Sequence, residues 1–563
     1  MTSTGPITVY RAKRVVTLDP ARPVAEAVAV RGDRILAAGS LDELAYFDGT
    51  RIDDRYADDV VFPGFVEAHA HAMSGALWRS VYVGFHDRRD LSGRVWPGCR
   101  SIDDVIARLS EADARMSAAG DAATAPDALL FGWGLDPAFF PGERLAAKHL
   151  DLASATRPIF VLHGNAHVAS VNSAMMRRHA IDRSVSVEGV ERDALGEPNG
   201  ELREIPAMSL ASSGFSRVLD DLDVPTLRES AVEAVNAGTT TMVDLASSVM
   251  MTDAGIDIYR TAVESDEHPV RLAPFHFGVT PTPGMSLDQV VERLQLLSAE
   301  STAKLRLRGY VKLMLDGSIQ SHTARLQEPG YLNHAENGMW TMSPEYFEEA
   351  FTAYHRAGML MHVHCNGDEA TELMLDTVER VLTRHPRPDH RHTVTHSQLS
   401  TAAQYRRMAA LGLCANILPG HMRFWGEIHR TYSVGPDRAA RMNAAATALR
   451  EGVPISLHSD TPVTPLDPLA TVSYAAERRT WADQPIGPGE SITIEQGLRA
   501  VTIGAAHMLK MDAEVGSIEG GKRADFAILD RDPTEVVEPA ELRDIAVRGT
   551  MLGGRAFSAA SGA

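Results

Sequence analysis

The sequence has little cysteine and no long apolar run. Cys99, Cys365 and Cys414 are the only cysteines in 563 residues. So low and odd a count in a long chain excludes a disulfide framework, and we expect a reducing, cytoplasmic environment. There is no run of 18 apolar residues, so the sequence predicts no membrane span. The N-terminal residues also lack the apolar core of a signal peptide.

Basic residues are too few to balance the acidic ones. The chain carries 55 Lys and Arg against 74 Asp and Glu, a formal net charge of −19. This balance argues against nucleic acid or an anionic membrane surface as a partner. We find no nucleotide-binding glycine loop either. The remaining composition, 44% hydrophobic and 23% charged, is typical of a soluble globular protein. The partner that we expect is a small-molecule substrate.

Short β-type segments alternate with helical patterns through the middle of the chain. Strand–helix alternation predicts a parallel sheet, and eight such units predict an α/β fold, a (β/α)₈ TIM-like barrel. A homodimer is common for such barrels. The expected strands are the apolar run that begins at Val60 and the segments 238–246, 270–279, 308–317, 358–368, 392–398, 413–420 and 454–462.

Both ends of the chain are rich in strand and turn signals. We expect residues 1–61 and 511–563 to pair into a small β-sandwich-like domain, with the barrel spanning 62–510. The gap between the first two barrel strands, from about 84 to about 225, is far too long for one helix. It predicts an insertion that covers the barrel mouth.

Polar residues stand where the barrel strands are expected to end. The first strand leads into "VVFPGFVEAHAHAMSG", in which two histidines lie two residues apart and would share one face. Because the carboxyl ends of barrel strands meet at one mouth, these side chains should converge there. Imidazoles and a carboxylate suit Zn²⁺, or Mn²⁺, Fe²⁺ or Co²⁺. The residues are His69, His71, Lys312, His362, His364, His396 and Asp460.

The predicted cluster is chemically coherent. Lys312 lies among apolar neighbours, which lower the pKa of its amine and allow it to take up carbon dioxide as a carbamate that bridges two metals. Two metals sharing a water would supply hydroxide near neutral pH, and a nearby carboxylate can move its proton. Each residue also has a plain structural reading, such as a core histidine or an N-cap aspartate. Their order along the chain favours the metal site.

The sequence resembles the amidohydrolase superfamily. The matching segments are "PGFVEAHAHA", "VKLMLDGS", "HCNGDEA", "THSQ", "HSDTP" and "GSIEGGKRADFAILD". "DGSIQSHTA" and "HGNAHVASVNSAMM" further resemble the YtcJ-like, amidohydrolase-3 branch, which includes N-substituted formamide deformylase. The resemblance covers nearly the whole chain. It implies a (β/α)₈ barrel with a β-sandwich-like domain built from both termini.

The resemblance also implies a ligand set, with zinc as the first metal and one or two ions per chain. One ion would be bound by His69, His71 and Asp460, and the second by His364 and His396. Lys312, N6-carboxylated, would bridge both. Asp460 would in addition be the catalytic general acid and base.

Two histidines depart from the family pattern. His362 stands where an apolar residue is expected, and His458 where a small one is commoner. Each shares a face with a proposed ligand, so they are second-layer partners, substrate contacts or packed core histidines, or they shift the metal assignment. The insertion offers further substrate contacts: His163 and His167 in "HGNAH", and Trp133 in "FGWGLDPAFF". Arg325, after the lysine strand, is another candidate contact.

The leading interpretation is a metal-dependent amidohydrolase. It would cleave the C–N bond of an amide, formamide or cyclic amide with a metal-activated hydroxide. A deaminase, which in this superfamily usually has one metal and no bridging lysine, is one alternative. An ester or lactone hydrolase is another, because the same hydroxide attacks either carbonyl. A non-catalytic binding barrel is a third, and the retained Asp460 counts against it.

Overall fold

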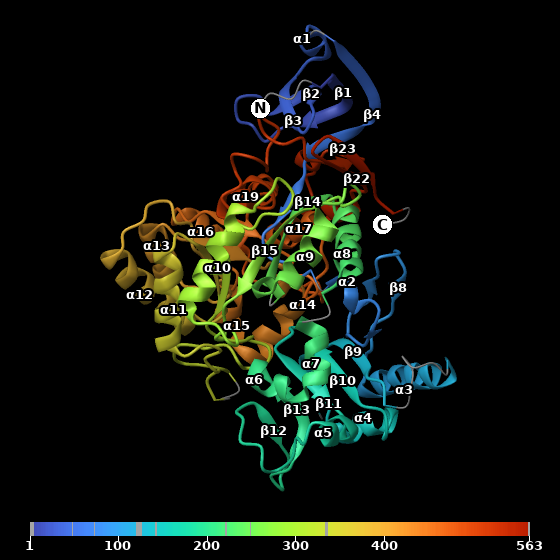
Figure 1. Ribbon diagram of the computed structural model, residues 1–563, viewed down its shortest axis with the longest axis vertical. Coiled ribbons are helices and arrows are strands. Elements are labelled where there is room, and N and C mark those ends of the chain that lie inside the picture. The colour runs from blue at the N-terminus through green and yellow to red at the C-terminus, as the bar shows by residue number, and fades with distance from the viewer. Residues whose placement is uncertain are drawn as a thin grey trace.

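The computed structural model describes residues 5–560 except 48, 73, 120–126, 141–143, 220–221, 248 and 333–335. Three large sheets follow one another along its long axis (Figure 1). A seven-stranded sheet built from both termini lies at one end, an eight-stranded parallel sheet in the middle and a six-stranded sheet at the other end. No helix in the described part of the chain is long and apolar enough to cross a membrane.

The central sheet is the predicted barrel. Its strands lie in sequence order, and each strand pairs in parallel with its neighbours. All eight expected strands form, which confirms the predicted fold class. They are β5 (Phe65–Glu67), β14 (Thr239–Ser247), β15 (Arg271–Phe277), β16 (Tyr310–Met314), β17 (Leu360–Cys365), β18 (Thr393–His396), β19 (Cys414–Ile417) and β20 (Ile455–Leu457).

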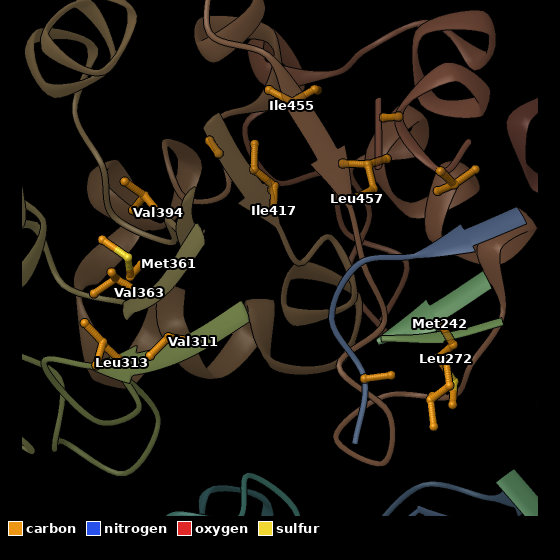
Figure 2. Packing of buried hydrophobic residues seen from close by; sticks show 14 of the residues in the cluster. Met242, Leu272, Val311, Leu313, Met361, Val363, Val394, Ile417, Ile455 and Leu457 are labelled. Carbon is orange, nitrogen blue, oxygen red and sulfur yellow. The ribbon is translucent and has the colours of Figure 1, made fainter. Parts of the chain in front are cut away.

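Side-chain alternation along these strands separates the helix-packed face from the barrel interior. Val311 and Leu313 of β16 pack in the same cluster as Met361 and Val363 of β17 and the surrounding helices, and Figure 2 shows these four side chains together. The residues between them point to the opposite face. Lys312 lies among those inward-facing residues and is buried.

Helices follow the barrel strands and cover the outside of the sheet. Helix α13 shows how the sequence sets their limits. The Thr401 hydroxyl accepts a hydrogen bond from Gln404 N, and the Gln404 side chain accepts one from Thr401 N. Gly412, with a φ of 71°, ends the helix. The helices of the barrel region are α8 (Val224–Asn236), α9 (Asp253–Val263), α10 (Leu287–Ala299), α11 (Pro344–Arg356), α12 (Asp368–Arg384), α13 (Ala402–Leu411), α14 (Gly420–Ile428), α15 (Gly435–Ala440), α16 (Ala445–Arg450), α17 (Pro468–Glu477), α18 (Ile494–Ala500) and α19 (Ile503–Met508).

The two termini share one sheet. Its order is β23-β22-β21-β4-β1-β2-β3, and β21 pairs antiparallel with β4, so that Phe526 lies opposite Pro63. The small β domain built from both termini is thereby confirmed. Its elements are β1 (Ile7–Val16), β2 (Val24–Arg31), β3 (Arg34–Gly39), α1 (Leu41–Ala45), β4 (Thr50–Pro63), β21 (Phe526–Leu529), β22 (Val547–Leu552) and β23 (Arg555–Ser558).

The apolar run from Val60 is two strands rather than one. It leaves the terminal sheet as β4 and enters the barrel as β5, and Gly64 is the break between them. A Cβ at Gly64 would lie 2.1 Å from Thr240 Oγ1, so only glycine lets this segment approach β14 so closely. One length of chain therefore ties the terminal sheet to the first barrel strand.

The insertion has a sheet of its own, with strand order β12-β13-β11-β10-β9-β6. Buried aromatic and aliphatic side chains form its core, separate from the barrel core. Its elements are α2 (Ser74–Leu77), β6 (Val81–Tyr82), β7 (Arg88–Arg89), β8 (Val95–Trp96), α3 (Ile102–Ala119), β9 (Leu130–Leu135), α4 (Ala147–Ala153), β10 (Ile159–His163), β11 (Val168–Val171), α5 (Ser173–Arg178), β12 (Val190–Arg192), β13 (Pro198–Arg203), α6 (Glu204–Met208) and α7 (Ser212–Leu219).

A buried ion pair links the barrel to the terminal sheet. Arg271 of β15 lies 2.7 Å from Asp525, and both side chains are at most 3% exposed. Replacing Arg271 by methionine leaves Asp525 as an unpaired buried charge, so we expect the free energy of unfolding to fall by about 3–5 kcal/mol. Urea unfolding followed by circular dichroism measures this.

The double variant Arg271→Met/Asp525→Leu is the control, because it removes both charges and should recover most of the loss. The exposed pair Arg115–Glu111 is a second control. Its removal should cost less than about 1 kcal/mol. If Arg271→Met also lowered the free energy of unfolding by less than about 1 kcal/mol, the buried pair would not stabilise the contact between the barrel and the terminal sheet.

Candidate metal centre

The two histidines of the opening motif follow strand β5 rather than lie in it. β5 ends at Glu67, so His69 and His71 belong to the connection at its carboxyl end. Backbone hydrogen bonds hold this connection against the segment after β20. Asp460 N donates to the His69 carbonyl at 3.1 Å, and His71 N donates to the Thr461 carbonyl at 3.0 Å. The imidazole rings lie 5.4 Å apart, so loop contacts place the pair side by side.

Three of the predicted imidazoles surround the carboxylate of Asp460. His69 Nε2 and His71 Nε2 lie 3.0 and 3.3 Å from Oδ1, and His396 Nδ1 lies 3.7 Å from Oδ2. Burial holds the pKa of His69 and of His396 well below its ordinary value, so both rings are neutral at pH 7. Burial acts to raise the pKa of Asp460, but the imidazoles keep it well below its usual range. Neutral imidazoles beside an ionised carboxylate are in the protonation states that a metal ion requires.

His364 and Lys312 come from neighbouring strands. The His364 ring lies 4.4 Å from that of His396. His364 Nε2 is 3.0 Å from Asn366 Nδ2 and 3.2 Å from the carbonyl oxygen of Gly317. Lys312 is buried, and burial lowers the pKa of its amine to about 7. A substantial fraction of the amine is therefore neutral near pH 7 and able to react with carbon dioxide.

One cavity of about 110 Å³ brings the predicted ligands together. Side chains of the insertion form part of its wall, so the insertion covers the barrel mouth. All six residues predicted as metal ligands line it. They are His69, His71, Lys312, His364, His396 and Asp460, beside Asn165, His167, Met208 and Phe215 from the insertion.

The two histidines that depart from the family pattern do not line this cavity. His458 is buried, and its ring stacks on that of His69 at 4.5 Å with an interplanar angle of 16°. His362 is also buried and packs against Phe275 at 4.7 Å. Neither is therefore placed to touch a substrate in the cavity.

Of the two histidines in "HGNAH", only His167 reaches the cavity. Its Nδ1 lies 2.9 Å from Glu204 Oε2, and its ring is 5.2 Å from that of His364. Burial opposes protonation of His167, but Glu204 raises its pKa above the ordinary value. His163 is buried in β10, where Nε2 lies 3.0 Å from Ser170 Oγ.

Trp133 and Arg325 also lie outside the lining of the cavity. Trp133 is buried against Trp78 in the insertion, with ring centres 4.9 Å apart. Arg325 pairs with Glu369 at 2.9 Å and lies over the ring of Trp340. Their positions give no support to the predicted substrate contacts.

Sequence reasoning missed a buried carboxylate that joins the two ligand-bearing segments. Glu67 Oε1 accepts a hydrogen bond from His69 N at 3.0 Å, and Oε2 accepts from Ser459 N and Oγ at 3.1 and 2.8 Å. β5 and β20 are the two edge strands of the barrel sheet, and the Glu67 side chain connects the segments that follow them. Burial raises the pKa of Glu67 to about 8. The signal was present, because a carboxylate in an otherwise apolar strand needs a partner.

The donor atoms fit a metal ion. His69, His71 and Asp460 offer ligand atoms within 4.8 Å of one another. His69 Nδ1 and His396 Nδ1 are buried, and among the residues that the structure describes they have no hydrogen-bond partner. Imidazole nitrogen with carboxylate oxygen is the donor set of zinc sites.

The chain is similar to several curated proteins over most of its length. Protein LONG AFTER FAR-RED 3 of Arabidopsis thaliana is 28% identical over 530 residues, covering 92% of this chain and 85% of that protein. N-substituted formamide deformylase of Arthrobacter pascens is 27% identical over 553 residues, 96% of each chain. This similarity to the deformylase confirms the resemblance read from the motifs.

Among solved structures, an uncharacterized metal-dependent hydrolase from Pyrococcus horikoshii OT3 has the same fold. It superposes with a TM-score of 0.70 at 19% identity, covering 94% of this chain and 99% of the other. The model of the amidohydrolase family matches residues 57–557. That match covers the barrel, the insertion and the C-terminal strands of the terminal sheet, and the chain therefore belongs to the amidohydrolase family, a family of hydrolytic enzymes.

Proposed function

We propose that this protein hydrolyses the C–N bond of an amide, formamide or cyclic amide with the help of a divalent metal ion, zinc in the first place. The observation that carries the proposal is the cluster in which His69, His71 and His396 surround Asp460. The same cavity is lined by Lys312 and His364. A site of this composition would hold a metal where a small substrate could reach it.

The proposed ligand set follows the order of the strands. His69 and His71 would hold one ion with Asp460, and His364 and His396 a second. Lys312, carboxylated, would bridge the two. When bound, the metal supplies a water of lowered pKa and polarises a carbonyl group.

The protein's own residues carry the remaining steps. The Asp460 carboxylate, held low in pKa, accepts a proton and returns it to the departing amine. Its position is fixed by the backbone hydrogen bond to His69 and by Glu67, which binds the neighbouring Ser459. Met208 and Phe215 of the insertion give the cavity an apolar wall opposite the polar ligand set.

The choice of a C–N bond rests on the relative named as an N-substituted formamide deformylase, 27% identical over nearly the whole of both chains. A deaminase is the second candidate, because His69, His71 and Asp460 form a compact group that would serve a single ion. The lysine in the same cavity favours the amidohydrolase. Ester and lactone hydrolysis use the same polarised carbonyl, so they belong in the same substrate panel.

Metal content tests the proposal. Protein purified without added metal or chelator should contain about two equivalents of metal per chain by elemental analysis, because the cavity offers donors for two ions. The same protein should turn over a member of an amide and formamide panel.

About one equivalent, with turnover of aminopurines rather than amides, would favour the deaminase. Removing the metal with a chelator and restoring zinc is the control that ties activity to the ion. No metal before or after soaking would contradict the proposed function.

A further inference from the structure

His167 presents one ring nitrogen to the cavity of the candidate metal centre. Its Nδ1 lies 2.9 Å from Glu204 Oε2, and its side chain is 12% exposed. Among the residues that the structure describes, this is the only hydrogen bond of the ring, and Nε2 is not one of the buried atoms. His167 lines the cavity, so Nε2 is available to a bound molecule. The proposed ligand set and the proposed proton transfers do not use it.

Backbone and side-chain hydrogen bonds fix the position of the His167 ring. His167 N donates to Asn165 Oδ1 at 2.9 Å, and the His167 carbonyl accepts from Glu204 N at 2.7 Å. Asn165 Nδ2 donates in turn to Ser318 Oγ at 3.1 Å, in the segment that follows β16. The turn of the insertion that carries His167 is therefore tied to the barrel, and the ring is held in one place at the cavity wall.

Glu204 is held in an unfavourable conformation and environment. Its backbone has a φ of 60°, in the left-handed region, and its side chain is only 2% exposed. Its Oε1 has no hydrogen-bond partner in the described part of the chain. A Cβ at Gly317 would lie 2.2 Å from this oxygen, so the glycine leaves room for the carboxylate. A strained backbone and a buried carboxylate whose side-chain partner is a single histidine point to a functional role.

The Glu204 carboxylate determines which nitrogen of His167 carries the proton. Because Glu204 accepts the Nδ1 proton, Nε2 of the neutral ring has a lone pair and accepts hydrogen bonds. The nearby negative charge also makes this lone pair more basic. Burial lowers the pKa of His167, but Glu204 raises it above its ordinary value. An amide group has one hydrogen-bond donor, its N–H.

We propose that His167 is a further catalytic residue, whose Nε2 accepts a hydrogen bond from the N–H of the scissile amide, and that Glu204 is its positioning residue. The inference rests on the proposed function and names its substrate class more narrowly. It favours amides that carry an N–H over esters and tertiary amides, because a site built to bind an N–H rejects analogues that lack it.

The same contact would accelerate the cleavage step. Asp460 and His167 line one cavity. As Asp460 returns its proton to the departing nitrogen, that nitrogen gains positive charge and its N–H becomes a stronger donor. His167 itself neither gains nor loses a proton. The hydrogen bond is therefore stronger in the transition state than in the bound substrate, which is the condition for catalysis by binding.

The test compares an amide with the matching ester in His167→Phe. The probes are the most active amide of the panel and the ester of the same chain, such as N-butylformamide and butyl formate. The ester has oxygen in place of N–H and nearly the same size. Phenylalanine keeps a planar ring but removes the acceptor, so kcat/KM for the amide should fall about 10–100-fold, as for loss of a hydrogen bond to a charged group. The value for the ester should change little, and the metal content should stay at the wild-type level.

Two further variants complete the test. Glu204→Gln keeps the shape of the side chain but lets the proton move to Nε2, which is the wrong tautomer for an acceptor. It should lower the ratio of amide to ester turnover as His167→Phe does. His163→Phe is the matched control, because His163 belongs to the same motif but is buried and does not line the cavity. It should keep the wild-type ratio.

An active His167→Phe enzyme with the wild-type ratio of amide to ester turnover would overturn this inference alone, and so would equal losses for both substrates. Should His167→Phe fail to fold, the same ratio in Glu204→Gln decides. A wild type that hydrolyses the amide but not the ester would support the N–H contact, because the ester is the more reactive compound. A wild type that hydrolyses no amide would overturn the proposed function and this inference together.

Discussion

Replacing Asp460 with asparagine should lower kcat about 10²–10⁴-fold while most of the metal stays bound. Asparagine keeps the shape of the side chain but cannot accept and return a proton, and general acid–base catalysis is worth about that factor. The imidazoles of His69, His71 and His396 remain in place to hold the ion. Turnover of the best amide substrate and elemental analysis of the same preparation measure the two effects separately.

Asp467→Asn is the matched control. Asp467 is the N-cap of α17, a few residues further along the chain, and it does not line the cavity. Asparagine caps helices about as well as aspartate, so this variant should keep full activity. An Asp460→Asn enzyme that turned over as fast as the wild type would remove Asp460 from the mechanism.

Replacing Lys312 with alanine should abolish activity and release metal. The amine is buried with a pKa lowered to about 7, in the cavity that holds the other proposed ligands. Loss of a residue that only hydrogen-bonds to a metal ligand weakens metal binding about 10–100-fold. If the Lys312 carbamate bridges two ions, its removal should weaken metal binding by more than that. A short carboxylic acid in the buffer should restore part of both metal and activity, because it can take the place of the carbamate.

Lys304→Ala serves as the control for loss of a lysine. Lys304 is half-buried and donates to the carbonyl of Ser265, away from the cavity. It should retain metal and activity. Full metal content in Lys312→Ala would contradict a bridging role and leave the lysine as a structural residue of the barrel.

Most of the barrel could be predicted from the sequence because each strand carries its own evidence. In β16, for example, Lys312 lies between Val311 and Leu313. Because neighbouring residues of a strand point to opposite faces, Lys312 belongs to the barrel interior and the two apolar residues to the helix-packed face. The break at Gly64 could not be predicted. Both sides of it are apolar, and the need for glycine comes from Thr240, which only the folded chain brings near.

The candidate site could likewise be predicted from the sequence only in part. Residues at strand ends were predictable, because parallel strands in a barrel deliver their carboxyl ends to one mouth. The insertion was not, because its histidines share one motif and only backbone geometry separates them. His163 ends β10, and the chain then turns through Ala166 at φ 59° before His167 reaches the cavity. The link from Glu67 to Ser459 also depends on contacts between distant segments.

The pairing of Phe526 with Pro63 has a consequence for how the protein is made. During synthesis from the N-terminus, β4, His69 and His71 leave the ribosome long before β21, the strand that pairs with β4. Asp460 likewise appears late. Loop closure over such separations is slow, and a partly made chain exposes unpaired strand edges. Until almost the whole chain has been translated, the edge of β4 therefore has no partner strand, and His69 and His71 lack the carboxylate of Asp460.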